Sequence, residues 1–152
     1  MAIRPVCCVP HEGLRTPAAP VTRFTKELRT LVRDLLETMH AHEGVGLAAP
    51  QIGHSVRVFV ANPSGRSSGA LAVVNPILEA ESGTAGIVEG CLSVPDAWQR
   101  VPRWACVRLR GQDPSGRPLR LSAKGLLAIV IQHELDHLEG RLIIDARGAV
   151  RD

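Results

Sequence analysis

Between Gln132 and His137 the chain carries two histidines and a glutamate whose spacing could bind and activate a metal ion. Residues four apart share one face of a helix, so the imidazoles of His133 and His137 can point at the same ion. Glu134 can then reach a water on that ion as a general base. The pattern His-Glu-x-x-His therefore indicates metal-dependent hydrolysis, although two histidines leave the site short of the three protein ligands usual in a catalytic centre.

The third ligand could be a histidine, a carboxylate or a cysteine elsewhere in the chain. Cys91 stands out because its setting, from Glu89 to Pro95, is Glu-Gly-Cys-Leu-Ser-Val-Pro. Gly before it and Pro after it predict an irregular, closely packed loop rather than a core strand. A buried thiol with no ligand role remains the alternative, because free cysteines are often buried.

A third segment, Gly-Val-Gly-Leu-Ala-Ala-Pro-Gln from Gly44 to Gln51, combines small residues with one amide side chain. Its small residues allow another backbone or a substrate to approach closely. Gln51 could donate a hydrogen bond to an oxyanion that develops during a reaction. Taken alone the segment is ambiguous, because a pair of glycines after a helix is commonly just a turn.

The first element expected to position these residues is an amphipathic helix from Val21 to Gly44. Thr22 or Thr25 can cap its start, and Gly44 is the expected stop. Its apolar residues recur at three-and-four spacing and form one stripe. They are Leu28, Leu31, Val32, Leu35, Leu36 and Met39.

A second helix is predicted over about Lys124 to Leu138, with Ser122 near its cap and Gly140 after its end. The run from Leu126 to Ile131 is apolar all round, which is typical of a buried helix. The polar residues that follow on a buried helix need partners, and a metal ion is the most economical one.

Short strands are expected between the two helices, at Val56 to Val60, Leu71 to Val74 and Cys106 to Arg110. A turn at Asp113 to Gly116 predicts a hairpin from the third of these strands into Pro118 to Leu121. Hairpin-connected strands between two separate helices favour an α+β fold with an antiparallel or mixed sheet. The length of 152 residues fits a single domain over 1–152.

Composition narrows the functional classes. The chain is 45% hydrophobic and 22% charged, with a net charge of +3 spread along it, so no specific nucleic-acid binding is expected. No apolar leader is visible, and the longest apolar run is too short to span a bilayer. Cys7 and Cys8 are adjacent and no Cys-x-x-Cys occurs, which favours reduced thiols in a cytoplasmic protein.

The segments Gly-Val-Gly-Leu-Ala-Ala-Pro-Gln, Glu-Gly-Cys-Leu-Ser and Gln-His-Glu-Leu-Asp-His-Leu-Glu-Gly occur in that order. This resembles the three-motif signature of the peptide deformylases. The likeness extends over nearly the whole chain, through Pro10, Leu14-Arg15, Asn75-Pro76, Val101-Pro102-Arg103 and Gly125-Leu126-Leu127-Ala128. The fold it implies is α+β, with antiparallel or mixed sheets around a buried metal-binding helix that carries His-Glu-x-x-His, plus an N-terminal amphipathic helix.

The resemblance implies that Cys91, His133 and His137 bind one divalent metal ion, with water in the fourth position. That water would attack the formyl carbon of formyl-methionine on nascent polypeptides, with Glu134 as general base and then acid, and formate would be released. The resemblance also implies that Fe²⁺ is the favoured ion, with Zn²⁺, Ni²⁺ or Co²⁺ as substitutes.

The resemblance also assigns the surroundings of the ion. Gln51 and the backbone N–H of Leu92 would stabilise the oxyanion, and Gly46 and Gly90 would help to bind the substrate. Glu89 and Arg103 would form a structural ion pair that braces the cysteine loop. The methionine pocket would be lined by Val45, Ile87, Leu126, Ile129 and Val130.

The roles of two positions, and the contact with the ribosome, stay open from the sequence. Trp98 stands where many family members carry a polar or basic residue, so it could alter substrate contact or simply pack. Asp136 is expected in a structural hydrogen bond or ion pair, with orientation of a ligand histidine as the alternative. Only 15 residues follow His137, so docking to the ribosome through a C-terminal helix is in doubt, and a monomer is expected.

Two other functions compete with deformylation. A peptidase that cleaves internal bonds would share the His-Glu-x-x-His pattern, although a cysteine ligand argues against it. A formyl-peptide or metal-binding module without turnover would not need Glu134 as a base or Gln51 as a donor.

Overall fold

The computed structural model describes residues 2–66 and 69–145, and two α-helices organise this part of the chain. Helix α1 covers Lys26–Ala41 and helix α2 covers Gly125–Leu138. Short 3₁₀ helices lie at η1 (Glu12–Arg15), η2 (Ala49–Ile52) and η4 (Ile143–Asp145). Neither α-helix is long and apolar enough to cross a membrane.

The strands of the described part form two antiparallel sheets. The larger has the order β1-β2-β3-β6-β7, and the smaller is the hairpin β4-β5. Their bounds are β1 Gly46–Ala48, β2 Val58–Ala61, β3 Leu71–Ala85, β4 Val88–Cys91, β5 Val94–Arg100, β6 Arg103–Gln112 and β7 Pro118–Lys124. Two helices with antiparallel sheets confirm the expected α+β class.

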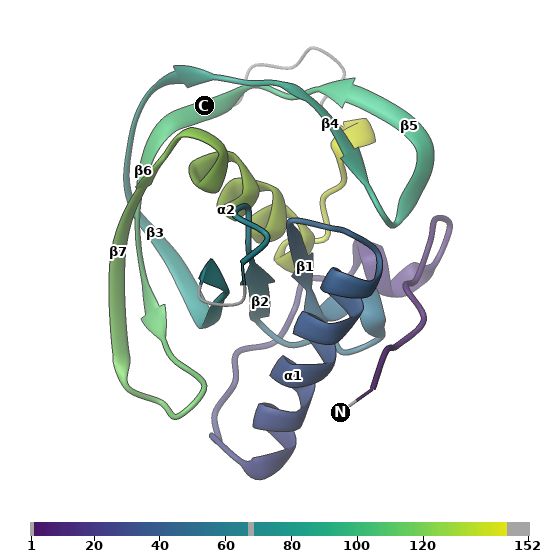
Figure 1. Ribbon diagram of the computed structural model, residues 1–152, viewed down its shortest axis with the longest axis vertical. Helices are drawn as coiled ribbons and strands as arrows, with labels where there is room; N and C mark the ends of the chain where they lie inside the picture. Colours follow the sequence, from purple (N-terminus) through teal and green to yellow (C-terminus); the bar gives the residue numbers. More distant parts are fainter. Residues whose placement is uncertain (1, 67–68, 146–152) are drawn as a thin grey trace.

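Helix α2 lies at the centre of the molecule. It contacts β1 and β2 as well as β6 and β7, so the curved large sheet encloses it, while α1 packs on β1 and β2 (Figure 1). Ala128 and Ile131 of α2 are fully buried together with Phe59 of β2 and Leu109 of β6. Such complete burial explains why the N-terminal half of α2 is apolar on all sides.

The first predicted helix begins too early and ends too late. Thr25 is its N-cap, where the Oγ1 atom accepts a hydrogen bond of 3.2 Å from the Leu28 N–H. The chain that leads to Thr25 makes contacts elsewhere and does not extend the helix. Ala19 forms a β-bridge with Val56, and Val21 exchanges hydrogen bonds with the side chain of Asn75.

The strand predictions found the right regions but missed their extent. Strand β3 is 15 residues long, where only Leu71 to Val74 was expected, because it continues past Pro76 through two irregularities in its pairing with β6. Strands β1, β4 and β5 were not predicted. Cys91 is accordingly the last residue of strand β4 rather than part of an irregular loop, since it pairs with Val94 of β5.

The start of α2 differs from the prediction. Ser122 lies in β7, and the N-cap of α2 is Lys124, whose side chain makes no capping hydrogen bond, so the predicted Ser122 cap is wrong. The sequence put docking through a C-terminal helix in doubt. Residues 146–152, on which this prediction bears, lie outside the described part.

Gln132 fixes how α2 sits on the sheet. Its side chain is buried, accepts a hydrogen bond of 2.8 Å from the Trp104 N–H and donates one of 2.9 Å to the Trp104 carbonyl. It also donates to the Ala128 carbonyl one turn earlier, at 2.9 Å. Because it lies next to His133, these bonds set the position of the first candidate ligand relative to β6.

We expect Gln132→Leu to lower the free energy of unfolding by about 2–4 kcal/mol, because the Trp104 N–H and C=O lose their buried partner. Urea unfolding followed by circular dichroism measures this. Gln99→Leu, which removes only a surface bond to Arg100, is the control and should change stability by less than about 0.5 kcal/mol. Equal stability of the two variants would contradict the role of Gln132.

Candidate active site

Three potential metal-ligating side chains converge where the β4–β5 hairpin meets α2. Cys91 ends β4, and His133 and His137 lie one turn apart on α2, with ring centroids 5.0 Å apart. One ligand atom from each of the three lies within 4.8 Å of the others. The Cys91 Sγ is 3.3 Å from His137 Nε2. A thiolate and two imidazoles at this separation form a donor set that could hold a metal ion.

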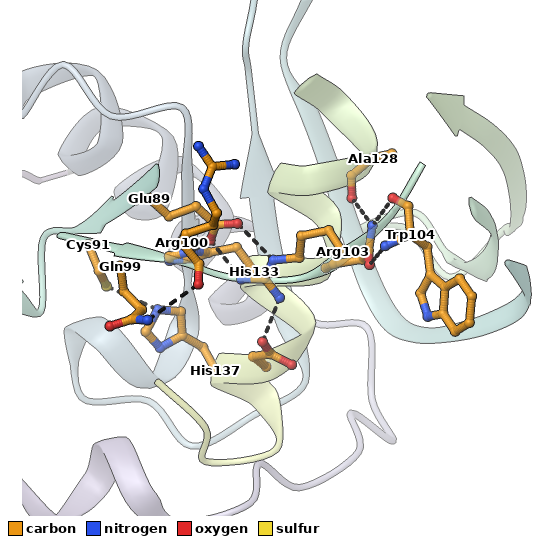
Figure 2. Close-up of polar contacts among 11 residues, drawn as sticks. Glu89, Cys91, Gln99, Arg100, Arg103, Trp104, Ala128, His133 and His137 are labelled. Atoms are coloured by element: carbon orange, nitrogen blue, oxygen red, sulfur yellow. Dashed lines mark hydrogen bonds and ion pairs between the residues drawn. The ribbon is translucent and has the colours of Figure 1, made fainter. Parts of the chain in front are cut away.

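A buried charge network holds these ligands from behind (Figure 2). The Oε1 atom of Glu89 lies 2.9 Å from His133 Nδ1, which leaves the Nε2 atom of His133 for an ion. Arg103 donates to both oxygens of Glu89, at 2.8 and 2.7 Å, and also to Asp136, at 2.7 Å. Asp136 therefore forms an ion pair with Arg103, the structural role favoured by the sequence.

The protonation behaviour of this cluster fits a site for a cation. Burial acts to lower the pKa of His133, but its contacts with Cys91 and Glu89 prevail and raise it to about 10. The ring of His133 is therefore a cation in the metal-free protein, and an ion that binds to its Nε2 atom takes the place of that proton. Burial holds the pKa of His137 well below its ordinary value, so this ring is neutral, as a ligand must be. Its buried Nδ1 atom has no hydrogen-bond partner within the described residues.

Glu134 lies beside the donor atoms and is only 3% exposed. Its Oε1 atom is buried with no hydrogen-bond partner in the described part of the chain, and burial raises the pKa of its carboxyl group to about 7. Gly46 makes room for it, because a Cβ atom there would lie 2.5 Å from Glu134 Oε2 and 2.8 Å from Val130 Cγ1. An unpaired carboxylate with a pKa near neutrality can both accept and deliver protons.

A cavity of about 410 Å³ opens in front of these groups. The structure brings to its wall nearly all the residues that the sequence assigned to the site. They are Val45, Gly46, Gln51, Ile87, Glu89, Gly90, Cys91, Leu92, Leu126, Ile129, Val130, His133 and Glu134. Arg103 and His137 do not line the cavity, because both are buried behind it.

The amide of Gln51 is held in one orientation. Its Oε1 accepts from the Ala48 N–H at 2.9 Å, and its Nε2 donates to Ser93 Oγ at 3.1 Å and lies 3.8 Å from Cys91 Sγ. A donor that is already fixed can stabilise developing charge without reorganising. Ser93 was missed by the sequence analysis, because nothing local in the sequence links it to a glutamine 42 residues away.

Five further residues that line this cavity were not assigned a role from the sequence: His42, Glu43, Gly44, Val88 and Trp98. Val88 and Trp98, on β4 and β5, line the same cavity and are exposed. Trp98 was left open between substrate contact and packing, and Val88 was not singled out. Their only signal in the sequence was nearness to Cys91, which does not tell on which side of a hairpin a residue lies.

The fold and this donor set are those of a metal-binding hydrolase. A model of the polypeptide deformylase family matches residues 3–151, and the chain belongs to that family. Similar solved structures include a peptide deformylase from Legionella pneumophila, 42% identical, with a TM-score of 0.93 over 95% of this chain and 86% of that one. Another, from Thermotoga maritima, is 35% identical with a TM-score of 0.91, and both chains are covered completely.

A third similar structure is a class I type b peptide deformylase from Acinetobacter baumannii with Met-Ala-Ser bound. It is 31% identical, with a TM-score of 0.90 over 95% of this chain and 98% of that one. The activity of the family is the metal-dependent removal of the N-formyl group from nascent polypeptides, and this chain is an enzyme of that kind. The alternative of an internal peptidase is thereby set aside.

We expect Arg103→Met to lower the free energy of unfolding by about 3–5 kcal/mol, because it removes the buried guanidinium that pairs with the Glu89 and Asp136 carboxylates. Arg110→Met is the matched control: Arg110 is exposed and lies 3.6 Å from Glu79, so its loss should cost less than about 1 kcal/mol. Urea unfolding measures both. Similar losses in the two variants would contradict the importance of the buried network.

Glu134 should make the stability of the metal-free protein depend on pH. Because its pKa is raised in the folded state from 4.5 to about 7, the unfolded chain releases the proton first, and stability falls as the pH rises across that range. Glu134→Gln removes this effect. The variant should therefore gain roughly 3 kcal/mol relative to the unsubstituted chain between pH 4.5 and pH 8.

Urea unfolding of chelator-treated protein at the two pH values measures this gain. A stability difference between Glu134→Gln and the unsubstituted chain that is the same at both pH values would contradict the raised pKa.

Proposed function

We propose that Cys91, His133 and His137 hold the catalytic metal ion of this deformylase and that Glu134 transfers the protons of the reaction. The convergence of the three donor atoms beside a buried, unpaired carboxylate carries this proposal. When bound, the ion would supply Lewis acidity and would lower the pKa of water to near neutrality. The ion would also favour the ionised form of Glu134, which then has the role of base.

Glu134 accepts a proton from the attacking water and later delivers it to the α-amine that leaves. The lack of a hydrogen-bond partner for its Oε1 atom within the described residues suits this role. An ion pair would move the pKa of the carboxyl group away from neutrality. The oxyanion that forms on the formyl carbon is stabilised by the Gln51 amide and by the backbone N–H of Leu92. The fixed bonds of Gln51 to Ala48 and Ser93 support this assignment.

The methionine side chain of the substrate occupies the apolar part of the cavity. Val45, Ile87, Leu126, Ile129 and Val130 supply its wall. Gly46 and Gly90 bring the peptide backbone close to the reacting groups, and at Gly46 any side chain would displace Glu134. The Met-Ala-Ser ligand of the Acinetobacter baumannii relative supports a site that accepts a peptide beginning with methionine.

We propose Fe²⁺ as the ion used in the cell, with Zn²⁺, Ni²⁺ or Co²⁺ as substitutes. A thiolate and two imidazoles accommodate all four ions, so the donor set alone does not separate them. Metal analysis of protein purified without oxygen tests the assignment. Stoichiometric zinc with full activity, and no gain on adding Fe²⁺, would exclude iron.

We further propose that residues 1–152 act as one catalytic domain, as a monomer in the cytoplasm, on nascent formylated peptides. Supporting this, the family acts on nascent peptides, and neither described helix is long and apolar enough to cross a membrane. A weak association with the ribosome fits the same substrate. Specific binding to DNA has no support.

We expect Glu134→Gln to lower kcat for release of formate from formyl-Met-Ala-Ser by at least about 100-fold, because the proton acceptor is lost. Metal content should be unchanged, since the three ligands remain. Glu81→Gln, on the exposed part of β3, is the control and should keep full activity. A Glu134→Gln enzyme that retains more than a tenth of the activity would show that another group moves the proton.

A further inference from the structure

Exposed apolar side chains gather at the mouth of the active-site cavity. Seven large apolar side chains of the described residues are exposed, and five of them line this cavity. The five are Val45, Ile87, Val88, Trp98 and Leu126. Three of these belong to the proposed methionine pocket. Val88 and Trp98 have no assigned role, although exposing large apolar groups at a cavity mouth is typical of a binding surface.

Trp98 is the most exposed of the seven, at 72%, and yet its position is defined. Its six-membered ring lies across Gly90, where a Cβ atom would be 2.6 Å from Cζ3, 2.9 Å from Cη2 and 3.0 Å from Cε3. One part of the ring therefore covers the backbone next to Cys91, and the rest faces solvent. Any residue other than glycine at position 90 would push the indole away.

The β4–β5 hairpin holds this indole at a set place relative to the candidate ligand Cys91. Glu89 pairs with Gln99 and Val88 with Arg100, so Trp98 and Val88 come from facing strands. The Arg100 guanidinium donates to the Gly86 carbonyl at 3.1 Å, which ties the end of β5 to the start of the hairpin. The buried Glu89–Arg103 pair anchors the hairpin to β6. Trp98 is thus mounted on a braced element and not on a free loop.

We propose that Val88 and Trp98 form a second apolar subsite, which binds a large apolar or aromatic side chain on one of the two residues after the formyl-methionine. This rests on the proposed methionine pocket. When the methionine side chain occupies that pocket, the rest of the peptide must extend past the cavity mouth. An apolar side chain laid on the indole removes apolar surface of both partners from water. An aromatic side chain adds the preference of rings for offset or edge-to-face contact.

The test compares kcat/KM for two peptide series, formyl-Met-X-Ser and formyl-Met-Ala-X, with X as Ala, Leu, Phe or Asp. The metal-loaded enzyme should prefer Phe and Leu over Ala by about tenfold in at least one series. Trp98→Ala should reduce that preference to less than about threefold, mainly by slowing the Phe and Leu peptides. Trp98→Phe should keep most of it.

Ile77→Ala is the matched control, because Ile77 is 47% exposed and does not line the cavity. It should leave the whole substrate profile unchanged. The proposal is overturned if the unsubstituted enzyme shows no preference in either series, or if Trp98→Ala leaves a preference intact.

A binding measurement separates this subsite from the proposed catalytic roles. Calorimetry with the deformylated peptides Met-X-Ser and Met-Ala-X needs no turnover. If formate release fails but Phe and Leu peptides still bind about tenfold tighter than Ala peptides, and Trp98→Ala removes this difference, the subsite stands and the catalytic roles fail. Equal binding of all peptides by both proteins would overturn the subsite alone.

Discussion

The buried guanidinium of Arg103 joins the three parts of the molecule that make the site. From β6 it bonds both oxygens of Glu89 on β4 and one oxygen of Asp136 on α2. Glu89 in turn bonds the Nδ1 atom of His133. Large sheet, small sheet and central helix thus meet at one charge cluster, in which each buried ion has an opposite partner. Moving any one of these three elements would separate buried charges from their partners. The cluster therefore restrains the distances between the candidate ligands.

The same cluster prepares the electrostatics of the site. Burial acts to raise the pKa of Glu89, but its bonds to Arg103 and His133 prevail and hold that pKa below its ordinary value. Negative charge behind His133 favours a cation in front of it. Glu134, four residues before the end of α2, is also buried, but its Oε1 atom has no hydrogen-bond partner in the described part of the chain. The two carboxylates therefore differ in their surroundings: Glu89 belongs to the charge cluster, and Glu134 is available for the proton transfer that we propose.

Much of the fold followed from local patterns. The apolar stripe of α1 and the continuous apolar run of α2 identified both helices. The pattern of apolar residues along a helix can be recognised within a few turns of local sequence. The hairpin of β6 and β7 was found from its turn residues at Asp113 to Gly116. Strands β4 and β5 were not, because Gly90 and Pro95 interrupt them and their pairing depends on the partner strand. The extension of β3 past Pro76 depends likewise on β6, which supplies its hydrogen bonds.

Local spacing was enough to place His133 and His137 on one helix face with Glu134 beside them, since helix geometry fixes residues four apart. The likeness of the chain to the deformylases supplied Cys91 and most of the cavity wall. The bond of Glu89 to His133, the bond of Ser93 to Gln51 and the contact of Trp98 with Gly90 became known from the three-dimensional structure alone. These contacts join residues that are distant in the chain or lie on facing strands. Strand pairing and packing determine their distances, and the spacing of residues along the chain does not encode them.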